Sequence, residues 1–340
     1  MKRNWMLPML ALFAFCALPA IGQGQQTGND AVRVQDDADP QEDPALAIQG
    51  EYVGAINGGG GDVTVGVQVI ALGNDEFEIV GYHGGLPGEG WDGEEPDRFS
   101  GKLEGGILTF SDERFNAELV NGRIELTTPD GMILGGLEKA QRQSETLGKE
   151  PPEGAYVFFD GTSTDKFEPA RNVQEVRMTE DGLLLQGVNS KHTYGDCHLH
   201  VEFRLSFMPK ARGQQRSNSG VYLQGSYEVQ VLDSFGLSGE HNECGGLYTV
   251  AKPSVNMCYP PMSWQTYDID FRAPRFDEAG EVTERARITV RHNGVLIHDD
   301  VELPNPTTAA PNGKAAEKGF LHLQDHGNTV WYRNIWMVEK

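Results

Sequence analysis

The sequence has 340 residues and a formal net charge of −22, from 50 acidic and 28 basic side chains. An excess of negative charge of this size repels nucleic acid and anionic membrane surfaces, which argues against both as partners. The length is enough for about two domains.

The first 22 residues have the pattern of a secretory signal peptide. Lys2 and Arg3 precede an apolar run from Trp5 to Ala20, and small residues follow where a signal peptidase cleaves. The run is too short, and has the wrong flanks, for a membrane span. The sequence therefore predicts an exported protein (periplasmic, cell-envelope or extracellular) with no membrane insertion after removal of residues 1–22.

Residues 23–44 form a polar, acidic segment with almost no large apolar side chains. A segment of that composition buries too little surface to offset its conformational entropy. We therefore expect a disordered acidic tether here.

Residues 45–140 have the pattern of a small all-β domain. Valines alternate with smaller or polar residues between Val63 and Val69, and Asn121-Gly122 separates two short apolar runs. A period of two is typical of strands with one buried face, and Asn-Gly is typical of a tight hairpin turn. The pattern predicts a barrel-like set of β-hairpins without helices.

Residues 141–153 are polar and end in two prolines, which predicts an interdomain linker. Strand patterns then continue from 154 to 340, where His198–Leu205 and Tyr227–Val231 alternate cleanly. Short alternating strands over this length are typical of a two-sheet sandwich or jelly roll. The fold class predicted for the whole chain is therefore all-β.

Alternation also sorts the polar side chains of the second domain onto sheet faces. Val229 and Val231 are expected between the two sheets, so Glu228 and Gln230 point the other way. If the strands near 222, 228 and 322 share a sheet, their polar side chains lie together on one outer face. These side chains are Tyr222, Gln224, Glu228, Gln230, His322 and Gln324.

Such a polar face suits a sugar, whose hydroxyls need hydrogen-bond donors and acceptors and whose C–H face needs an aromatic ring. Ordinary solvated side chains would give the same pattern, so both interpretations stand at this point.

The cysteines and histidines give weaker signals. After signal removal Cys197, Cys244 and Cys258 remain, and loop length favours Cys244–Cys258 if a disulfide forms. His198 and His200 share a strand face, but no zinc-ligand motif accompanies them. The sequence requires no cofactor, and it leaves open a divalent cation such as calcium held by carboxylates.

Several motifs of the second domain occur together. They are Phe158–Thr162, Asn218–Leu223, Tyr227–Asp233, Trp264–Ile269, Leu323–Asn328 and Tyr332–Trp336. With these motifs the segment from about 154 to 340 resembles the 3-keto-disaccharide hydrolase domain family, formerly a domain of unknown function. The resemblance implies a concanavalin-like jelly roll.

The resemblance also implies an oxidised (3-keto) sugar as substrate. A ketone at C3 acidifies the hydrogen on C2, so a base can remove it, and the substituent then leaves C1 with the help of an acid. Water may add later, giving net hydrolysis. By type and motif, the acid–base candidates are Glu228, His326 and Asp233.

Other polar residues of the second domain are candidates for binding the sugar substrate. They are Gln230, Gln324, Tyr222, Gln224, Arg333 and His322. We expect Glu228, Gln230, Gln324 and His326 to line one concave pocket, whereas Arg333 could instead form a structural ion pair with Asp325.

Three other functions fit parts of the sequence. Family-16-type endoglucanases carry Glu-x-Asp-x-Glu on one strand, but Gln230 and Leu232 follow Glu228 at the matching positions, which disfavours their double-displacement mechanism. A non-catalytic carbohydrate-binding module would use the same fold, and so would a structural protein of the cell envelope, because fold does not determine function.

Overall fold

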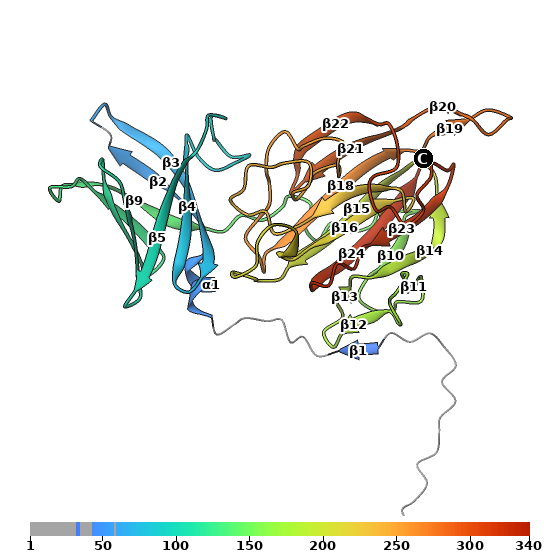
Figure 1. Ribbon diagram of the computed structural model, residues 1–340, viewed down its shortest axis with the longest axis horizontal. Coiled ribbons are helices and arrows are strands. Elements are labelled where there is room, and N and C mark those ends of the chain that lie inside the picture. The colour runs from blue at the N-terminus through green and yellow to red at the C-terminus, as the bar shows by residue number, and fades with distance from the viewer. Residues whose placement is uncertain (1–31, 35–42, 58) are drawn as a thin grey trace, which may run out of the picture.

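The structure is a computed structural model that describes residues 32–34, 43–57 and 59–340 (Figure 1). The predicted signal peptide and most of the predicted tether lie outside the described residues. Within them the chain forms 24 strands, one short helix, α1 (Pro44–Ile48), and one 3₁₀ turn (Gly213–Gln215). The predicted all-β fold class is confirmed. No helix among these residues is both long and apolar enough to cross a membrane.

One piece of the predicted tether is a strand. β1 (Val32–Val34) pairs in parallel with β12 (Arg177–Thr179). The Val-Arg-Val triplet has the β-branched residues that favour strands, and it adds to the free edge of a sheet. These three residues are therefore not part of a disordered tether.

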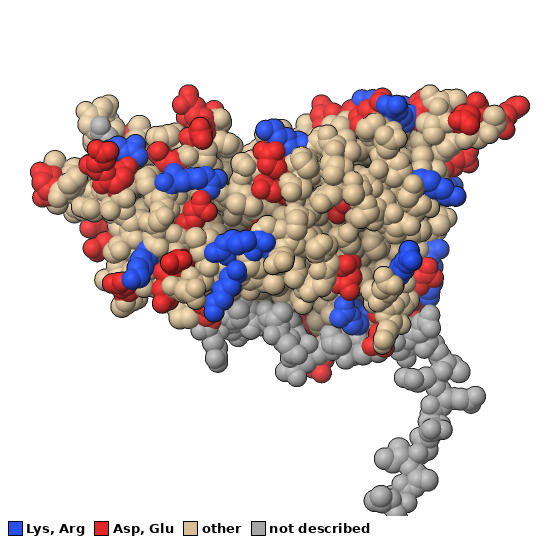
Figure 2. Space-filling view, in the orientation of Figure 1, with Lys and Arg blue, Asp and Glu red and all other residues tan. Residues whose placement is uncertain are grey.

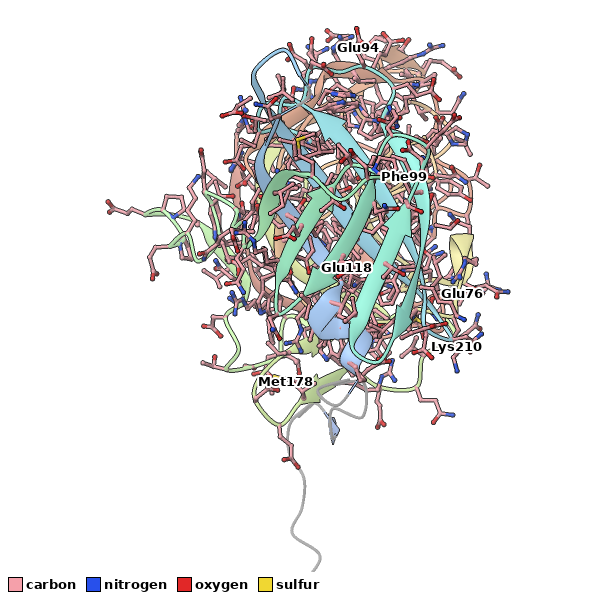
Figure 3. All side chains as sticks on the ribbon, turned by 90° about the vertical axis from the view of Figure 1, so that its left-hand side faces the viewer. Glu76, Glu94, Phe99, Glu118, Met178 and Lys210 are labelled. Atoms are coloured by element: carbon pink, nitrogen blue, oxygen red, sulfur yellow. The ribbon has the colours of Figure 1, made fainter. Side chains whose placement is uncertain are left out.

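The N-terminal domain is a closed barrel of eight antiparallel strands in which β9 closes on β2. Buried and exposed residues alternate along its later strands, so one face of each strand fills the interior. In Figure 3, which faces the barrel, Glu118 marks the outer side of such a strand. The strands are β2 (Gly50–Asn57), β3 (Asp62–Gly73), β4 (Glu76–His83), β5 (Asp97–Glu104), β6 (Ile107–Ser111), β7 (Asn116–Val120), β8 (Arg123–Thr127) and β9 (Ile133–Ala140).

The C-terminal domain is a sandwich of two sheets. The larger sheet has the order β1-β12-β13-β24-β15-β18-β21-β22, with β10 beside β24, and the smaller has the order β11-β14-β23-β16-β17. Strands of the larger sheet are β10 (Tyr156–Phe159), β13 (Leu184–Leu185), β15 (Cys197–Leu205), β18 (Trp264–Arg272), β21 (Ala286–His292), β22 (Val295–Leu303) and β24 (Val330–Glu339). Those of the smaller are β11 (Phe167–Pro169), β14 (Val188–Tyr194), β16 (Ser219–Leu223), β17 (Tyr227–Val231) and β23 (Gly319–Leu323). A small hairpin, β19 (Arg275–Phe276) with β20 (Val282–Glu284), projects beside them (Figure 1).

The sandwich core lies between the two sheets. Val221, Val229 and Leu323 from the smaller sheet and Leu199 and Phe203 from the larger belong to one buried apolar cluster. These valines and this leucine are the residues that alternation placed inward, so the polar residues between them must point out of the sandwich.

The segment between the domains is attached to the larger sheet. In residues 144–149, which we call the strap, the Ser144 hydroxyl lies 2.6 Å from that of Thr266. The backbone N–H of Gly148 donates to Glu202 over 2.5 Å, and Trp336 donates to the carbonyl of Lys149 over 3.2 Å. The strap is therefore held by polar contacts along its whole length.

The described residues contain no disulfide, so the pairing of Cys244 with Cys258 that the sequence left open is not formed. Cys197, Cys244 and Cys258 are buried free thiols. Cys244 Sγ lies 3.3 Å from the hydroxyl of Tyr267, and Cys258 Sγ lies 3.6 Å from the carbonyl of Leu232. The thiols of Cys244 and Cys258 thus each contact a polar group in the core.

Candidate active site

A row of polar side chains crosses three neighbouring strands of the smaller sheet. β16 lies between β23 and β17, and Tyr222 is paired with His322 on one side and with Glu228 on the other. Residues that are directly opposite on adjacent strands have their side chains on the same face. The fold therefore brings His322 beside Tyr222 and into line with Glu228, although about 100 positions separate it from them in the sequence.

Glu228 lies at the buried end of this row, with only 3% of its surface exposed. Burial raises the pKa of its carboxyl to about 8, although a hydrogen bond from Tyr222 lowers it in part. Gln324 donates in turn to the Tyr222 hydroxyl over 3.1 Å. The amide, the phenol and the carboxyl thus form a continuous hydrogen-bonded chain, in which the carboxyl is mostly protonated at neutral pH.

Gly220 makes room for that carboxyl. A Cβ at position 220 would lie 2.3 Å from Oε1 of Glu228 and 2.8 Å from the ring of Tyr222. Only glycine lets the acid lie directly over the backbone of β16. Gly220 belongs to the Asn218–Leu223 motif, but the sequence alone does not show that this glycine makes room for Glu228.

His322 occupies the other end of the row. Its ring centroid is 5.2 Å from that of Tyr222, and its Nδ1 is 2.8 Å from Oδ1 of Asn189 on β14. Burial lowers the pKa of the imidazole to about 4, so it is neutral at physiological pH. Because an amide oxygen only accepts, Nδ1 carries the hydrogen and Nε2 is left with a lone pair.

Gln230 shares the face but is already engaged. Its amide donates to Oε1 of Gln214 over 3.1 Å and approaches the carbonyl of Asn242 at 3.4 Å. The expected open, outward face is in fact closed over here, because the 3₁₀ turn and the 240s loop cover it. Gln324 and Asn189 are only half-buried, so the row reaches solvent on the β23–β14 side.

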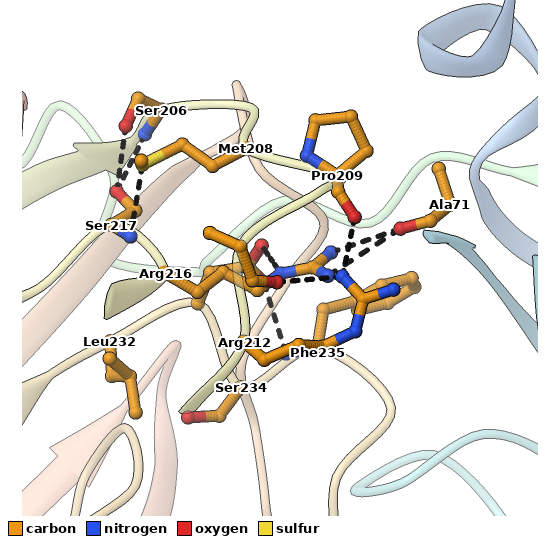
Figure 4. Close-up of polar contacts among 12 residues, drawn as sticks. Ala71, Ser206, Met208, Pro209, Arg212, Arg216, Ser217, Leu232, Ser234 and Phe235 are labelled. Atoms are coloured by element: carbon orange, nitrogen blue, oxygen red, sulfur yellow. Dashed lines mark hydrogen bonds and ion pairs between the residues drawn. The ribbon is translucent and has the colours of Figure 1, made fainter. Parts of the chain in front are cut away.

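Asp233 lies away from this row. Its carboxyl accepts from Nε of Arg216 over 2.5 Å and is buried. Arg216 in turn points toward the carbonyl of Ala71 in the barrel (Figure 4). This geometry gives Asp233 a structural partner at the contact between the domains.

Gln224 and Arg333 are also placed elsewhere. Gln224 sits in the turn after β16 with a positive φ of 56°, and its amide donates to the carbonyls of Tyr194 and Glu317. Arg333 belongs to the opposite sheet, where it pairs with Glu202 at 2.7 Å and not with Asp325. The alternative ion pair with Asp325 is therefore wrong.

His326 lies in the loop after β23 and is exposed. The described part of the chain offers its ring no hydrogen bond or ion pair. The neighbouring Asn328 accepts from the backbone N–H of Asn218 over 3.1 Å, which anchors the loop beside the row. His322, in contrast, lies in the same row as Glu228, with Tyr222 between the two.

The described residues contain no group of three or more His, Cys, Asp or Glu side chains arranged to hold a metal ion. His198 and His200 are engaged instead with Asp270 at 3.1 Å and Asp268 at 2.8 Å, on the face that the strap covers. His200 is linked to the strap, because its partner Asp268 also accepts from the Thr146 hydroxyl over 2.5 Å.

The acid, phenol, amide and imidazole of this row are groups that can hydrogen-bond the hydroxyls of a sugar, as a carbohydrate-active protein requires. A family model, the 3-keto-alpha-glucoside-1,2-lyase-like domain, matches residues 154–338. The chain belongs to that family.

One solved structure agrees with this assignment. A candidate glycosyl hydrolase from Parabacteroides distasonis, solved at 2.13 Å, is 30% identical, with a TM-score of 0.50 over 56% of this chain and 85% of that one. A second candidate glycosyl hydrolase from the same organism is 16% identical, with a TM-score of 0.41 over 55% of this chain and 94% of that one. Among curated proteins, none matches the chain.

Proposed function

We propose that the protein cleaves glycosides that carry a ketone at C3, by removing the C2 proton and expelling the substituent at C1. The observation that carries this proposal is the buried Glu228 carboxyl, whose pKa of about 8 lets it hold a proton at neutral pH. A buried carboxyl of this kind is suited to protonate a leaving group.

The neutral His322 supplies the complementary base. Its Nε2 lone pair takes the proton from C2, and the electrons of that C–H bond form an enolate with the C3 oxygen. The C1–O bond then breaks, a C1=C2 double bond forms, and Glu228 gives its proton to the departing oxygen. The products are an unsaturated 3-keto sugar and the free alcohol.

Tyr222 and Gln324 assist both the proton donor, Glu228, and the enolate that forms on the substrate. They link the Glu228 carboxyl to the half-exposed side of the row through hydrogen bonds. Donors of this type can also stabilise the developing enolate oxygen. The family description names a lyase on 3-keto-α-glucosides, which supports elimination as the first step.

The test is turnover of a 3-keto-glucoside beside its unoxidised parent, followed by the absorbance of the enone and by release of the alcohol. We expect turnover of the oxidised substrate alone. Glu228→Gln and His322→Ala should each lower kcat by at least about a hundredfold, the usual contribution of an acid–base group.

His326→Ala is the matched control, because it removes a nearby imidazole that is exposed. It should keep more than about a third of the activity. Loss of activity in His326→Ala but not in His322→Ala would refute the assignment of the base. Sugar-dependent thermal stabilisation without any product would instead identify a carbohydrate-binding module.

A further inference from the structure

The barrel contains a cavity that is separate from the candidate active site. It has a volume of about 930 Å³ and opens at the end of the barrel formed by Asn57, by the 59–62, 83–97 and 112–115 segments and by residues 128–133. An eight-stranded barrel is just wide enough to hold one small ligand, and ligand cavities usually measure about 300–1,000 Å³. The opposite half of the interior is filled by Tyr52, Phe77 and Leu119.

The wall of this cavity is apolar and partly aromatic. Val63, Val65 and Val67 line it from β3, and Phe99, Phe110 and Phe115 line the facing wall. Phe99 and Phe115 meet edge to face with ring centroids 5.2 Å apart. An aromatic ligand can continue such a packing pattern.

The mouth exposes large apolar side chains to water. Met132 is 64%, Ile133 66% and Val63 49% exposed. Apolar groups gathered at the entrance of an apolar cavity mark a place where an apolar molecule is captured. A barrel that served only as a spacer would not need to expose these apolar side chains to water.

Arg114, the arginine in the cavity lining, is paired with acidic side chains. Arg114 lies 2.6 Å from Asp112 and 3.5 Å from Asp97, so its charge is already matched by two carboxylates. The net charge of the chain, −22, also repels anions. The site therefore favours an uncharged ligand over an acid.

We propose that the barrel is a binding site for one small, uncharged, apolar molecule with an aromatic ring. The site is independent of the proposed reaction, because the residues that form it belong to the barrel alone.

The experiment uses two fluorescent probes with the same ring system. N-phenyl-1-naphthylamine is neutral, and 1-anilinonaphthalene-8-sulfonate adds one negative charge. We expect the full chain to bind one neutral probe saturably, at least about tenfold more tightly than the sulfonate.

Variants on β3 locate the probe. Val65→Trp fills the cavity and should weaken binding of the neutral probe by at least about tenfold. Thr64→Trp is the matched control, because Thr64 is adjacent in sequence but is not among the residues that line the cavity, and it should bind as the wild type does. Val63→Asp, at the exposed rim, should weaken binding without disturbing the packed half of the barrel.

Four outcomes would overturn the proposal: no saturable binding, tighter binding of the sulfonate, equal binding in all variants, or an equal loss in Thr64→Trp. Light scattering gives a further check. A dimer that Val63→Asp dissociates, in a chain that binds no probe, would assign the mouth to a second copy of the chain.

Discussion

At the scale of single residues, Glu228 couples the chemistry of the site to its stability. The pKa of its carboxyl is about 8 in the folded chain, above the ordinary value of 4.5. Between these values the folded state holds a proton that the unfolded state has released. The stability contributed by this group is therefore fully present below about pH 4.5 and is lost as the pH rises to about 8.

Glu228→Gln should remove this dependence, because an amide does not titrate. Urea unfolding between pH 5 and pH 8 should show the wild type losing stability relative to the variant, by about 5 kcal/mol at most. Glu118→Gln, an exposed carboxyl in the barrel, serves as the control and should follow the wild type. Parallel stability curves for the wild type and Glu228→Gln would show that the carboxyl is not desolvated.

At the scale of elements, one buried carboxylate helps to hold the strap at Gly148. Burial opposes the ionisation of Glu202, but hydrogen bonds from His200, Asn334 and Arg333 outweigh it and lower its pKa to about 2. The charged carboxylate also accepts from the backbone N–H of Gly148 in the strap. Its contribution to stability is present above its ordinary pKa and is lost only as the pH falls toward 2.

Glu202→Gln should therefore release the strap at neutral pH. Tryptic cleavage after Lys149 should become at least roughly fivefold faster, because local opening exposes the backbone to the protease. Asp270→Asn, which loses contacts to His198 and Lys340 but none to the strap, is the control. Equal cleavage of both variants would show that Glu202 does not hold the strap.

The strand pattern predicted much of this arrangement, because a period of two fixes which side chains face the core. It placed Glu228, Tyr222 and His322 on one face before their strands were known to be neighbours. It failed at Gln224, since a residue in a turn with positive φ no longer follows the alternation of its strand. The sequence also did not show how deeply the site is buried, because loops from other parts of the chain cover Gln230.

At the scale of the whole molecule, the barrel and the sandwich are joined by polar and apolar contacts. Arg212 donates to the carbonyl of Leu72 over 2.8 Å, and Arg98 donates to that of Gly236 over 3.0 Å. Phe235 of the sandwich packs among Ile70 and other apolar residues of the barrel. In Figure 2 the surface where the domains meet is continuous, with acidic and basic groups interspersed.

Arg142 makes a further connection, through a buried ion pair. Its guanidinium pairs with Glu51 of the barrel, donates to the carbonyl of Pro87 over 2.6 Å, and lies 5.0 Å from the ring of Tyr259 in the sandwich. The side chains of Arg142 and Glu51 are only 11% and 2% exposed. Removing the arginine would leave a carboxylate buried without its partner.

We therefore expect Arg142→Met to uncouple the two domains. Breaking a buried ion pair costs about 3–5 kcal/mol, and here the loss falls on the contact that makes the domains unfold together. Calorimetry should show one transition for the wild type and two for the variant. Arg123→Met removes an arginine from an exposed pair with Glu138 inside the barrel, so it should cost at most about 1 kcal/mol and keep a single transition. If Arg142→Met also unfolds in one transition with a similarly small loss, the coupling comes instead from the apolar contact around Phe235.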